Sequence, residues 1–221
     1  MEVTEAIRNR KSVRAFLDKP VPDRVITEIL ECARWAPSGA NTQPWHVAVL
    51  TGETKRQLGD ALAKRRADGE KPLPDYDYYP TQIEEPYIAR KYACGRALYS
   101  ALGIERKDIE ARKAQWAKNY HCFGAPVALL FFIDAILAKG SWVDTGMFIQ
   151  NVMLAARSHG LETCPQAALA EYPDVARDLL NIPDSKKLIC GIALGHADYD
   201  DPSYQYRTDR EPVDNFTRWY R

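Results

Sequence analysis

Residues 126–133, PVALLFFI, form a continuous apolar run that limits the possible folds of this chain more than any other feature. Such a run is typical of a strand buried on both faces of a sheet, because a strand with one solvated face alternates apolar and polar residues. Even with Ala125 included, the run is too short to cross a bilayer as a helix. Residues 188–195, LICGIALG, have the same character. We therefore predict two buried central strands.

A third strand and seven helices are predicted around these two strands. Residues 45–50 are bounded by Pro44 and Gly52, which favours a strand. The apolar residues that follow Asp23 recur at helical spacing, and Pro37 prevents continuation of that helix. Because helices and strands do not alternate as a regular βαβ series, the pattern predicts an α+β fold. Helices are expected at 4–10, from 23 to before Pro37, and at 54–66, 88–102, 108–119, 141–159 and 174–180.

One predicted helix and the C-terminal tail carry apolar side chains that we expect other parts of the protein to shield from solvent. The predicted helix at 141–159 is apolar on nearly all sides, so we expect it to be buried, with a subunit interface as one source of cover. The polar tail that begins at Asp198 ends with Phe216, Trp219 and Tyr220. We expect a tail with these aromatic residues to dock onto a surface.

Composition excludes several classes of function. A chain of 221 residues fits one domain, and 30 basic and 30 acidic residues argue against a nucleic-acid binder or a polybasic membrane anchor. The five cysteines and four histidines are scattered, so we expect neither a disulfide framework nor a bound metal. The N-terminus lacks the apolar core of a signal peptide, and we expect a cytoplasmic protein without a membrane partner.

Residues 68–90 contain four prolines and four tyrosines and show little periodicity. A long irregular segment in a compact domain is typical of a lid or of disorder, and aromatic residues favour the lid. We therefore predict one domain, 1–221, with a lid-like insertion at about 68–118. Tyr76, Tyr78 and Tyr87 are candidates for stacking on an aromatic substrate, although packing within the lid explains them equally well.

Arg10, Ser12 and Arg14 lie close together in RKSVRAF at 10–16. On a strand all three side chains share a face, and on a helix the two arginines still do. Two guanidinium groups beside a hydroxyl suit a phosphate, which guanidinium binds bidentately. By composition alone, however, a solvated basic face is the more common explanation.

APSGANTQPW at 36–45 connects a predicted helix to a predicted strand. Its two prolines fix the backbone around them, and Gly39 permits a left-handed turn. Ser38 and Asn41 offer hydrogen bonds. A simple turn is the expected structure if this segment is considered alone.

Taken together, four segments resemble the nitroreductase family of FMN-dependent oxidoreductases. They are RKSVRAF at 10–16, APSGANTQPWH at 36–46, GLETCPQAAL at 160–169 and RTDREP at 207–212, of which the first two are the more specific. The resemblance covers nearly the whole chain. It implies a nitroreductase-like α+β fold, with a central, mostly antiparallel sheet surrounded by helices, in an intertwined homodimer that has two FMN sites at its interface.

By this resemblance, Arg10 and Ser12 would bind the phosphate and ribityl chain of FMN, and Arg14 would place a positive charge near the N1/O2 edge of the ring. Residues 38–41 would line the flavin of the partner subunit, and the loop at 165–167 would lie beside N5. The implied cofactor-binding residues are Arg10, Lys11, Ser12, Arg14, Ser38, Gly39, Ala40, Asn41, Asn119, Pro165, Gln166, Ala167, Arg207 and Arg210, and the substrate contacts are Lys118, Tyr76, Tyr78 and Tyr87. Either Lys118 or Asn119 would reach the pyrimidine edge or the substrate.

The resemblance also implies that the flavin carries the chemistry and that no side chain acts as a catalytic acid or base. NADH or NADPH would deliver hydride to flavin N5 and leave before a nitroaromatic or quinone acceptor binds. The chain has no GxGxxG or P-loop motif, which fits an open pocket shared by donor and acceptor.

Two alternatives remain open at this stage. A reductive dehalogenase similar to the iodotyrosine deiodinases would use lid residues to hold an amino-acid zwitterion, and Glu84, Glu85, Tyr87 and Lys118 are the candidates for that role. The spacing of the glutamates and the tyrosine departs from the deiodinase pattern. The second alternative is a flavin-free interaction protein that has kept the same fold.

Overall fold

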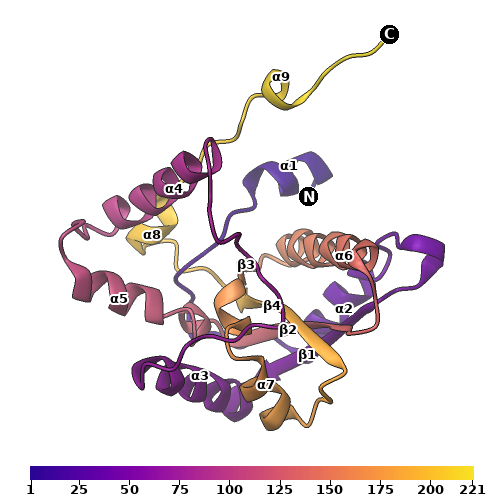
Figure 1. Ribbon diagram of the computed structural model, residues 1–221, viewed down its shortest axis with the longest axis horizontal. Helices are drawn as coiled ribbons and strands as arrows, with labels where there is room; N and C mark the ends of the chain where they lie inside the picture. Colours follow the sequence, from indigo (N-terminus) through magenta and orange to yellow (C-terminus); the bar gives the residue numbers. More distant parts are fainter.

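Four antiparallel strands form the central sheet of the computed structural model, which describes residues 1–221 (Figure 1). β2 (Val127–Asp134) and β4 (Lys186–Gly195) pair in the middle of the sheet. β1 (Trp45–Thr51) lies beside β2, and β3 (Glu162–Gln166) lies beside β4. The predicted α+β class and the three predicted strands are therefore confirmed, with the two apolar runs at the centre.

All seven predicted helices are present, with ends that differ by a few residues. Two further short helices, α8 and α9, lie in the C-terminal segment, and 3₁₀ turns precede β1 and β2 and follow β3. The helices are α1 (Val3–Asn9), α2 (Asp23–Ala33), α3 (Gly52–Ala67), α4 (Tyr87–Ala101), α5 (Ile109–Ala117), α6 (Lys139–Ser158), α7 (Pro173–Leu180), α8 (Pro202–Gln205) and α9 (Val213–Phe216).

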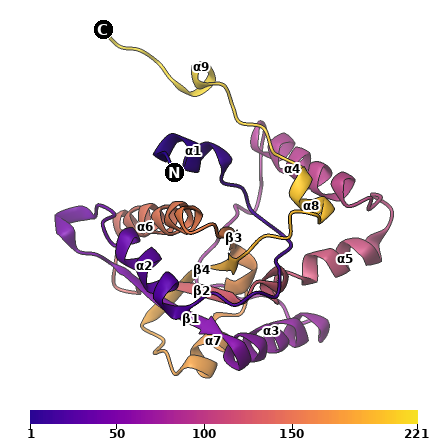
Figure 2. The same cartoon turned by 180° about the vertical axis from the view of Figure 1, so that it is seen from behind.

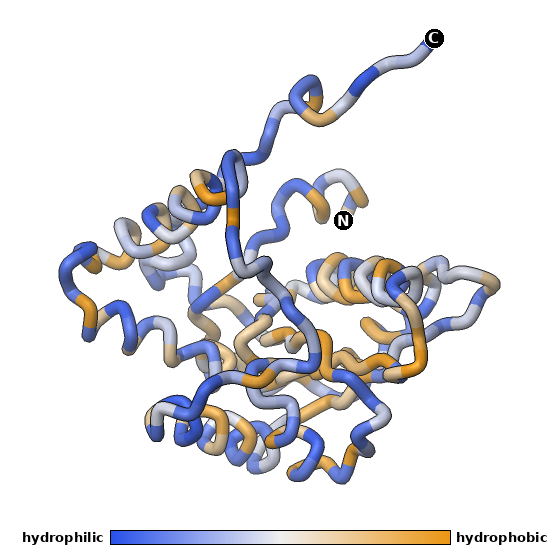
Figure 3. Tube along the Cα trace, in the orientation of Figure 1, coloured by the Kyte–Doolittle hydropathy of each residue, from blue (hydrophilic) through white to orange (hydrophobic).

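Alternate residues of β2 belong to two separate cores. Residues at odd positions from Val127 to Phe131 pack with α2 and α6, whereas residues at even positions from Ala128 to Phe132 pack with α3 and α7. Figures 1 and 2 show these two pairs of helices on opposite sides of the sheet, and Figure 3 shows apolar residues concentrated along its strands. Because both faces of β2 are covered, its sequence has no polar alternation.

β3 is the one strand that the sequence did not predict. Its five residues, ETCPQ, include a proline and were expected to form a loop. β3 pairs with β4 on one side only, and an edge strand tolerates proline because its outer N–H groups have no partner in the sheet. The correction matters for the site, because residues 165 and 166 are now held in register against Ile192 and Gly191.

α6 is buried on one side and uncovered on another. Phe148 and Val152 are almost fully buried against β2 and α2, whereas Val143 is 66% exposed and Met147 is 36% exposed. The expectation of a buried helix is thus correct for the face toward the sheet. Within a single chain it is wrong for the face that carries Val143 and Met147.

The C-terminal segment does not dock onto its own chain. Figures 1 and 2 show α9 and the residues after it extending away from the body of the molecule. Phe216, Trp219 and Tyr220 are 69%, 77% and 92% exposed. The predicted docking of these aromatic residues is therefore absent within one subunit.

The irregular part of the lid-like insertion is fastened to β4. β3 pairs with β4 only from Gly191 onward, and residues 75 and 76 lie beside the part of β4 that β3 leaves free. The Asp75 carboxylate accepts hydrogen bonds from the Leu188 N–H at 2.8 Å and from Arg177 at 2.8 Å. The Tyr76 hydroxyl donates to the Ile189 carbonyl at 2.8 Å.

None of the helices combines the length and the apolar character that a membrane span requires.

Two glycines inside helices provide a test of the packing between α3 and the segment before β2. A Cβ on Gly59 would lie 2.8 Å from the backbone oxygen of Tyr120, whereas a Cβ on Gly95 in α4 would meet no atom within 4 Å. We expect Gly59→Ala to lower the free energy of unfolding by about 1–2 kcal/mol, because backbone must move to relieve the overlap. Gly95→Ala, the matched control, should raise it by up to about 1 kcal/mol. Urea unfolding measures both changes, and equal stabilisation of the two variants would contradict the packing described.

Candidate functional site

Residues 10–16 form an extended segment beside β3. The Val13 N–H donates to the Thr163 carbonyl at 3.0 Å, Ser12 forms a parallel bridge with Thr163, and Val13 and Phe16 are buried. Of the two conformations that the sequence allowed, the extended one is therefore correct. It places Arg10, Ser12 and Arg14 on the side of the segment opposite Val13.

This segment meets the C-terminal segment in a small pocket of about 70 Å³, which we call the basic pocket. Residues that the sequence placed at opposite ends of the chain are brought together here, and Cys94 of α4 and Tyr206 join them without having been predicted. Tyr206 directly precedes the RTDREP motif, which was the available signal. The residues that line the basic pocket are Arg10, Lys11, Ser12, Arg14, Cys94, Tyr206, Arg207, Thr208 and Arg210.

The five cationic side chains of the basic pocket form no ion pair with a carboxylate. Burial lowers the pKa of Arg10, and the nearby Arg210 guanidinium lowers it further. Burial also lowers the pKa of Lys11; Glu162 opposes that shift, and Arg207 adds to it. Crowded positive charge that forms no ion pair is what an anion-binding site requires, because the ligand supplies the missing negative charge.

Neighbouring groups fix two of these cations in place. The Lys11 ammonium donates to the Tyr204 carbonyl. The Arg14 guanidinium donates to the Ser12 carbonyl at 3.1 Å and to the Tyr206 hydroxyl. The buried carboxylate of Glu162, whose charge acts on both Arg10 and Lys11, forms its own ion pair with Arg157.

Gln166 and Asn119 hold the end of β3 against the end of α5. The Gln166 side-chain amide donates to the Asn119 carbonyl at 2.8 Å and to the Asn119 side-chain oxygen at 3.1 Å. The Asn119 amide in turn donates to the Trp116 carbonyl at 2.7 Å. Because these side chains bond to each other, the exposed Pro165 and half-buried Ala167 offer mainly backbone groups to a ligand beside β3.

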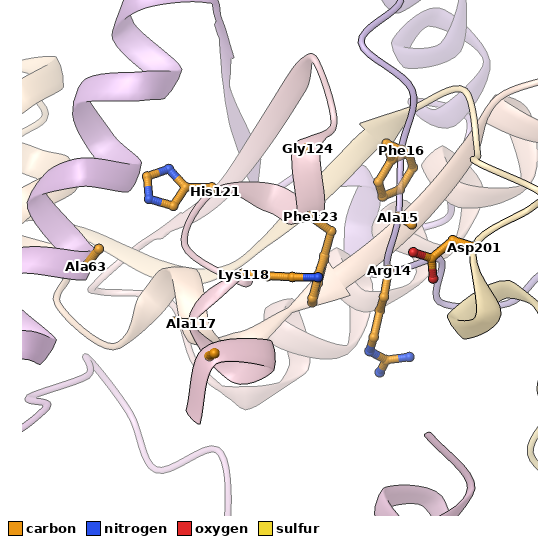
Figure 4. A pocket seen from close by; sticks show the side chains of 11 residues that line it. Arg14, Ala15, Phe16, Ala63, Ala117, Lys118, His121, Phe123, Gly124 and Asp201 are labelled. Atoms are coloured by element: carbon orange, nitrogen blue, oxygen red, sulfur yellow. The ribbon is translucent and has the colours of Figure 1, made fainter. Parts of the chain in front are cut away.

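A larger cavity of about 490 Å³ adjoins the basic pocket at Arg14, which borders both (Figure 4). Its walls come from α3, α5, the turn before β2 and the extended segment at 14–16. Figure 4 shows Lys118 and Arg14 reaching the cavity from different segments. The residues that line it are Arg14, Ala15, Phe16, Ala63, Ala114, Ala117, Lys118, His121, Phe123, Gly124 and Asp201.

The loop at 36–45 has a specific backbone conformation. Ala40, Asn41 and Gln43 have φ values of 49°, 57° and 49°, whereas Gly39 is not left-handed. The left-handed turn that Gly39 would permit is therefore made by its neighbours. The Ser38 hydroxyl accepts from the Gln43 N–H at 3.0 Å. A left-handed alanine is strained, and such strain is found preferentially at functional sites.

This loop lies far from the basic pocket of its own chain. The Gly39 N–H donates to the Asp144 carboxylate, at the start of α6, at 3.1 Å. The basic pocket lies near the other end of α6, where Arg157 pairs with Glu162 of β3. At 1.5 Å per residue, Asp144 and Arg157 are roughly 20 Å apart along the helix. A single chain therefore does not bring residues 38–41 together with Arg10, Ser12 and Arg14 (Figure 1).

The predicted tyrosine contacts line neither the basic pocket nor the cavity. Tyr76 packs edge-on against Trp142 with 4.6 Å between ring centroids, and burial raises the pKa of its hydroxyl. Tyr78 contacts Tyr76 and Tyr79, and Tyr87 at the start of α4 is 65% exposed. Tyr76 therefore fastens its segment to β4 and α6, and a role for the other two in substrate binding stays a prediction.

Comparison with known proteins agrees with this geometry. The family model described as Nitroreductase family matches residues 7–196. A 4-nitrobenzoate reductase of Pseudomonas putida is 39% identical over 216 residues, covering 96% of this chain and 93% of that protein. A nitrobenzene nitroreductase of Ectopseudomonas oleovorans is 38% identical over 216 residues, covering 97% of this chain and 95% of that protein.

A solved structure is similarly close. The crystal structure of the FMN and NADPH-dependent nitroreductase NfnB from sphigopyxis sp. strain HMH superposes with a TM-score of 0.97 at 40% identity, covering 100% of this chain and 99% of that chain. The family resemblance seen in the four sequence segments is thus confirmed over nearly the whole length of the protein, and this chain belongs to the nitroreductase family.

Proposed function

We propose that this protein is an FMN-dependent oxidoreductase that uses NADH or NADPH to reduce nitroaromatic compounds. The observation that carries the proposal is the basic pocket, in which five cations converge and none forms an ion pair with a carboxylate. A phosphate ester fits this pocket because its oxygens accept several charge-assisted hydrogen bonds at once. Bound FMN would supply the redox chemistry, accepting hydride from the nicotinamide and passing electrons to the nitro group.

The residues of the pocket divide between the two ends of such a ligand. Arg10, Lys11, Arg207 and Arg210 would hold the phosphate, and the Ser12 hydroxyl would contact the ribityl chain. Arg14 would face the pyrimidine edge of the ring, since it stands where the basic pocket meets the cavity. Backbone groups at 165–167 would lie beside the ring, because the Gln166 side chain is bonded to Asn119.

Arg14 has a second role in this proposal. Its guanidinium is held by the Ser12 carbonyl and the Tyr206 hydroxyl, so its positive charge stays fixed in position before any reaction. A preorganised charge stabilises negative charge that develops nearby without the cost of reorienting solvent. The protein would thus favour the reduced form of the cofactor through Arg14.

A homodimer would complete the site with residues 38–41 of a second subunit. Three features support this assembly: the distance between this loop and the basic pocket of its own chain, the exposed Val143 and Met147 face of α6, and the exposed aromatic residues of the C-terminal segment. Large exposed apolar side chains of this kind are typical of interaction surfaces.

Donor and acceptor would occupy the same open space in turn, in a ping-pong sequence. The chain has no dinucleotide-binding motif that would give the nicotinamide a separate site. Quinones are a second proposed class of acceptor, because they too are planar and accept two electrons.

The dehalogenase alternative has less support from the geometry. It requires Glu84 or Glu85 and Tyr87 to surround a ligand together with Lys118. The Glu85 carboxylate instead accepts from the Ala89 N–H at 3.3 Å in the first turn of α4, and none of these three residues borders the cavity that Lys118 lines. The flavin-free alternative predicts a colourless protein that stays colourless when FMN is added.

Substitution of Arg10 tests the phosphate site. We expect Arg10→Ala to raise the Kd for FMN at least about tenfold, because it removes a charge-assisted hydrogen bond worth roughly 1.5–3 kcal/mol. Titration of apo-protein by flavin fluorescence measures this change. Riboflavin, which lacks the phosphate, should bind the variant and the parent protein equally. Arg56→Ala, on the outer face of α3, is the matched control, and a similar loss of FMN affinity in both variants would refute the assignment.

Substitution of Arg14 tests the fixed charge. We expect Arg14→Ala to weaken FMN binding and to lower the two-electron reduction potential by about 30 mV or more, which corresponds to about 1.4 kcal/mol. The sign follows because the lost positive charge stabilised the more negative, reduced form. Spectroelectrochemistry measures the potential, and Arg14→Lys should recover much of it. If the reduction potential of Arg14→Ala equals that of the parent protein, Arg14 does not stabilise the reduced flavin.

Complementation tests whether two subunits build each site. Arg10→Ala damages the basic pocket, and Asn41→Ala damages the loop that the partner would supply. When the two variants are co-expressed with different tags and purified as a heterodimer, one site carries both intact parts and the other carries both defects. We expect about half of the parental flavin content and activity. If all contributions came from one chain, each site of the heterodimer would carry one defect, and no such recovery would be measured.

A further inference from the structure

The cavity beside the basic pocket bears on which acceptor this protein prefers. Relatives of nearly equal identity are named for a charged acceptor, 4-nitrobenzoate, and for an uncharged one, nitrobenzene. Sequence identity therefore does not distinguish between the two classes. The side chains that line the cavity provide an independent criterion.

The apolar walls of the cavity suit a flat ring. Ala63 of α3 faces the space together with Ala114 and Ala117 of α5, and Phe16 and Phe123 contribute aromatic surface. The three alanines leave room that larger side chains would fill. A volume of about 490 Å³ lies within the range usual for small-molecule sites.

Lys118 is the one ionisable group on the cavity without a partner. Its ammonium forms no hydrogen bond or ion pair, and its exposed side chain borders the cavity at the end of α5. The Asp201 carboxylate accepts from the Ser203 N–H at 2.7 Å and caps α8. The imidazole of His121 lies 4.0 Å from the Asp60 carboxylate, and Arg14 is bonded to Ser12 and Tyr206.

We propose that this cavity binds a planar aromatic carboxylate, with the ring against the alanine wall and the carboxylate on Lys118. Nitroaromatic acids are then preferred as acceptors over neutral nitroaromatics of the same shape. The inference rests on the proposed nitroreductase function and names the substrate class of that site. The Asp201 carboxylate lies on the same cavity and repels an anion, whereas the Arg14 guanidinium attracts one. Because Arg14 is already bonded to Ser12 and Tyr206, Lys118 is the cation that is free to pair with the carboxylate.

A direct binding measurement tests the preference without turnover. Benzoate and benzamide have the same shape and differ in charge, and neither contains a nitro group. By calorimetry with the FMN-loaded protein, we expect benzoate to bind about tenfold more tightly than benzamide, with a difference that shrinks as salt is added. Lys118→Met keeps an apolar stem and should abolish the difference. Lys113→Met, on the same helix and paired with Glu110 outside the cavity, should preserve it.

Steady-state kinetics provide a second measurement with matched acceptors. We expect Lys118→Met to lower the ratio of kcat/KM for 4-nitrobenzoate to kcat/KM for 4-nitrobenzamide about tenfold. Ala114→Phe, which fills the cavity without changing charge, should lower kcat/KM for both acceptors while FMN remains bound.

The results separate this inference from the proposed function. A protein that binds FMN and reduces 4-nitrobenzamide, but binds benzoate no more tightly than benzamide, overturns the inference and leaves the proposed function intact. An equal effect of Lys118→Met on both acceptors also overturns it. A protein that binds no FMN and reduces no nitro compound overturns the proposed function itself.

Discussion

Burial of β2 and β4 on both faces is the constraint on which the rest of the structure depends. Because β2 is apolar at every position from Val127 to Ile133, helices must cover the sheet from both sides. α2 and α6 cover one face, and α3 and α7 cover the other. The edges of this sandwiched sheet are then the places where polar backbone is accessible. The extended segment at 10–16 lies against β3 on one such edge, and Asp75 and Tyr76 bond to the part of β4 that β3 leaves free.

The candidate site is built from charges that the fold gathers but does not neutralise. Arg10 and Lys11 come from the segment beside β3, and Arg207 and Arg210 come from the C-terminal segment. Their mutual repulsion and partial burial disfavour the charged forms, as the lowered pKa values of Arg10 and Lys11 indicate. The apolar packing of Val13 and Phe16 holds the segment in place against this repulsion. A bound anion would remove the imbalance, which connects the stability of this region to ligand binding.

A single chain does not complete the arrangement. The loop at 36–45 adopts a strained left-handed conformation at Ala40, yet it lies near the start of α6, away from the basic pocket. The same side of the molecule leaves Val143 exposed on α6, and the C-terminal aromatic residues extend into solvent. A second copy of the chain would give each of these features a partner. The proposed homodimer thus accounts for three separate observations with one assembly.

Local sequence patterns determined the elements of this protein, and tertiary contacts decided the site. The apolar run at 126–133, the helical periodicities and the four family segments predicted the α+β fold, the central strands and most residues of the basic pocket, with Cys94 and Tyr206 as exceptions. The sequence left open whether 10–16 is extended, because Arg10 and Arg14 share a face at both strand and helix spacing. It also missed β3, since an edge strand of five residues containing a proline is stabilised by its pairing with β4 and not by its own composition. The surroundings of Tyr76 and Lys118 were likewise hidden from the sequence. Tyr76 fastens its segment to β4 through Ile189, whereas Lys118 stands unpaired at a cavity. Which of these a side chain does depends on groups many residues away that only the folded chain brings within reach.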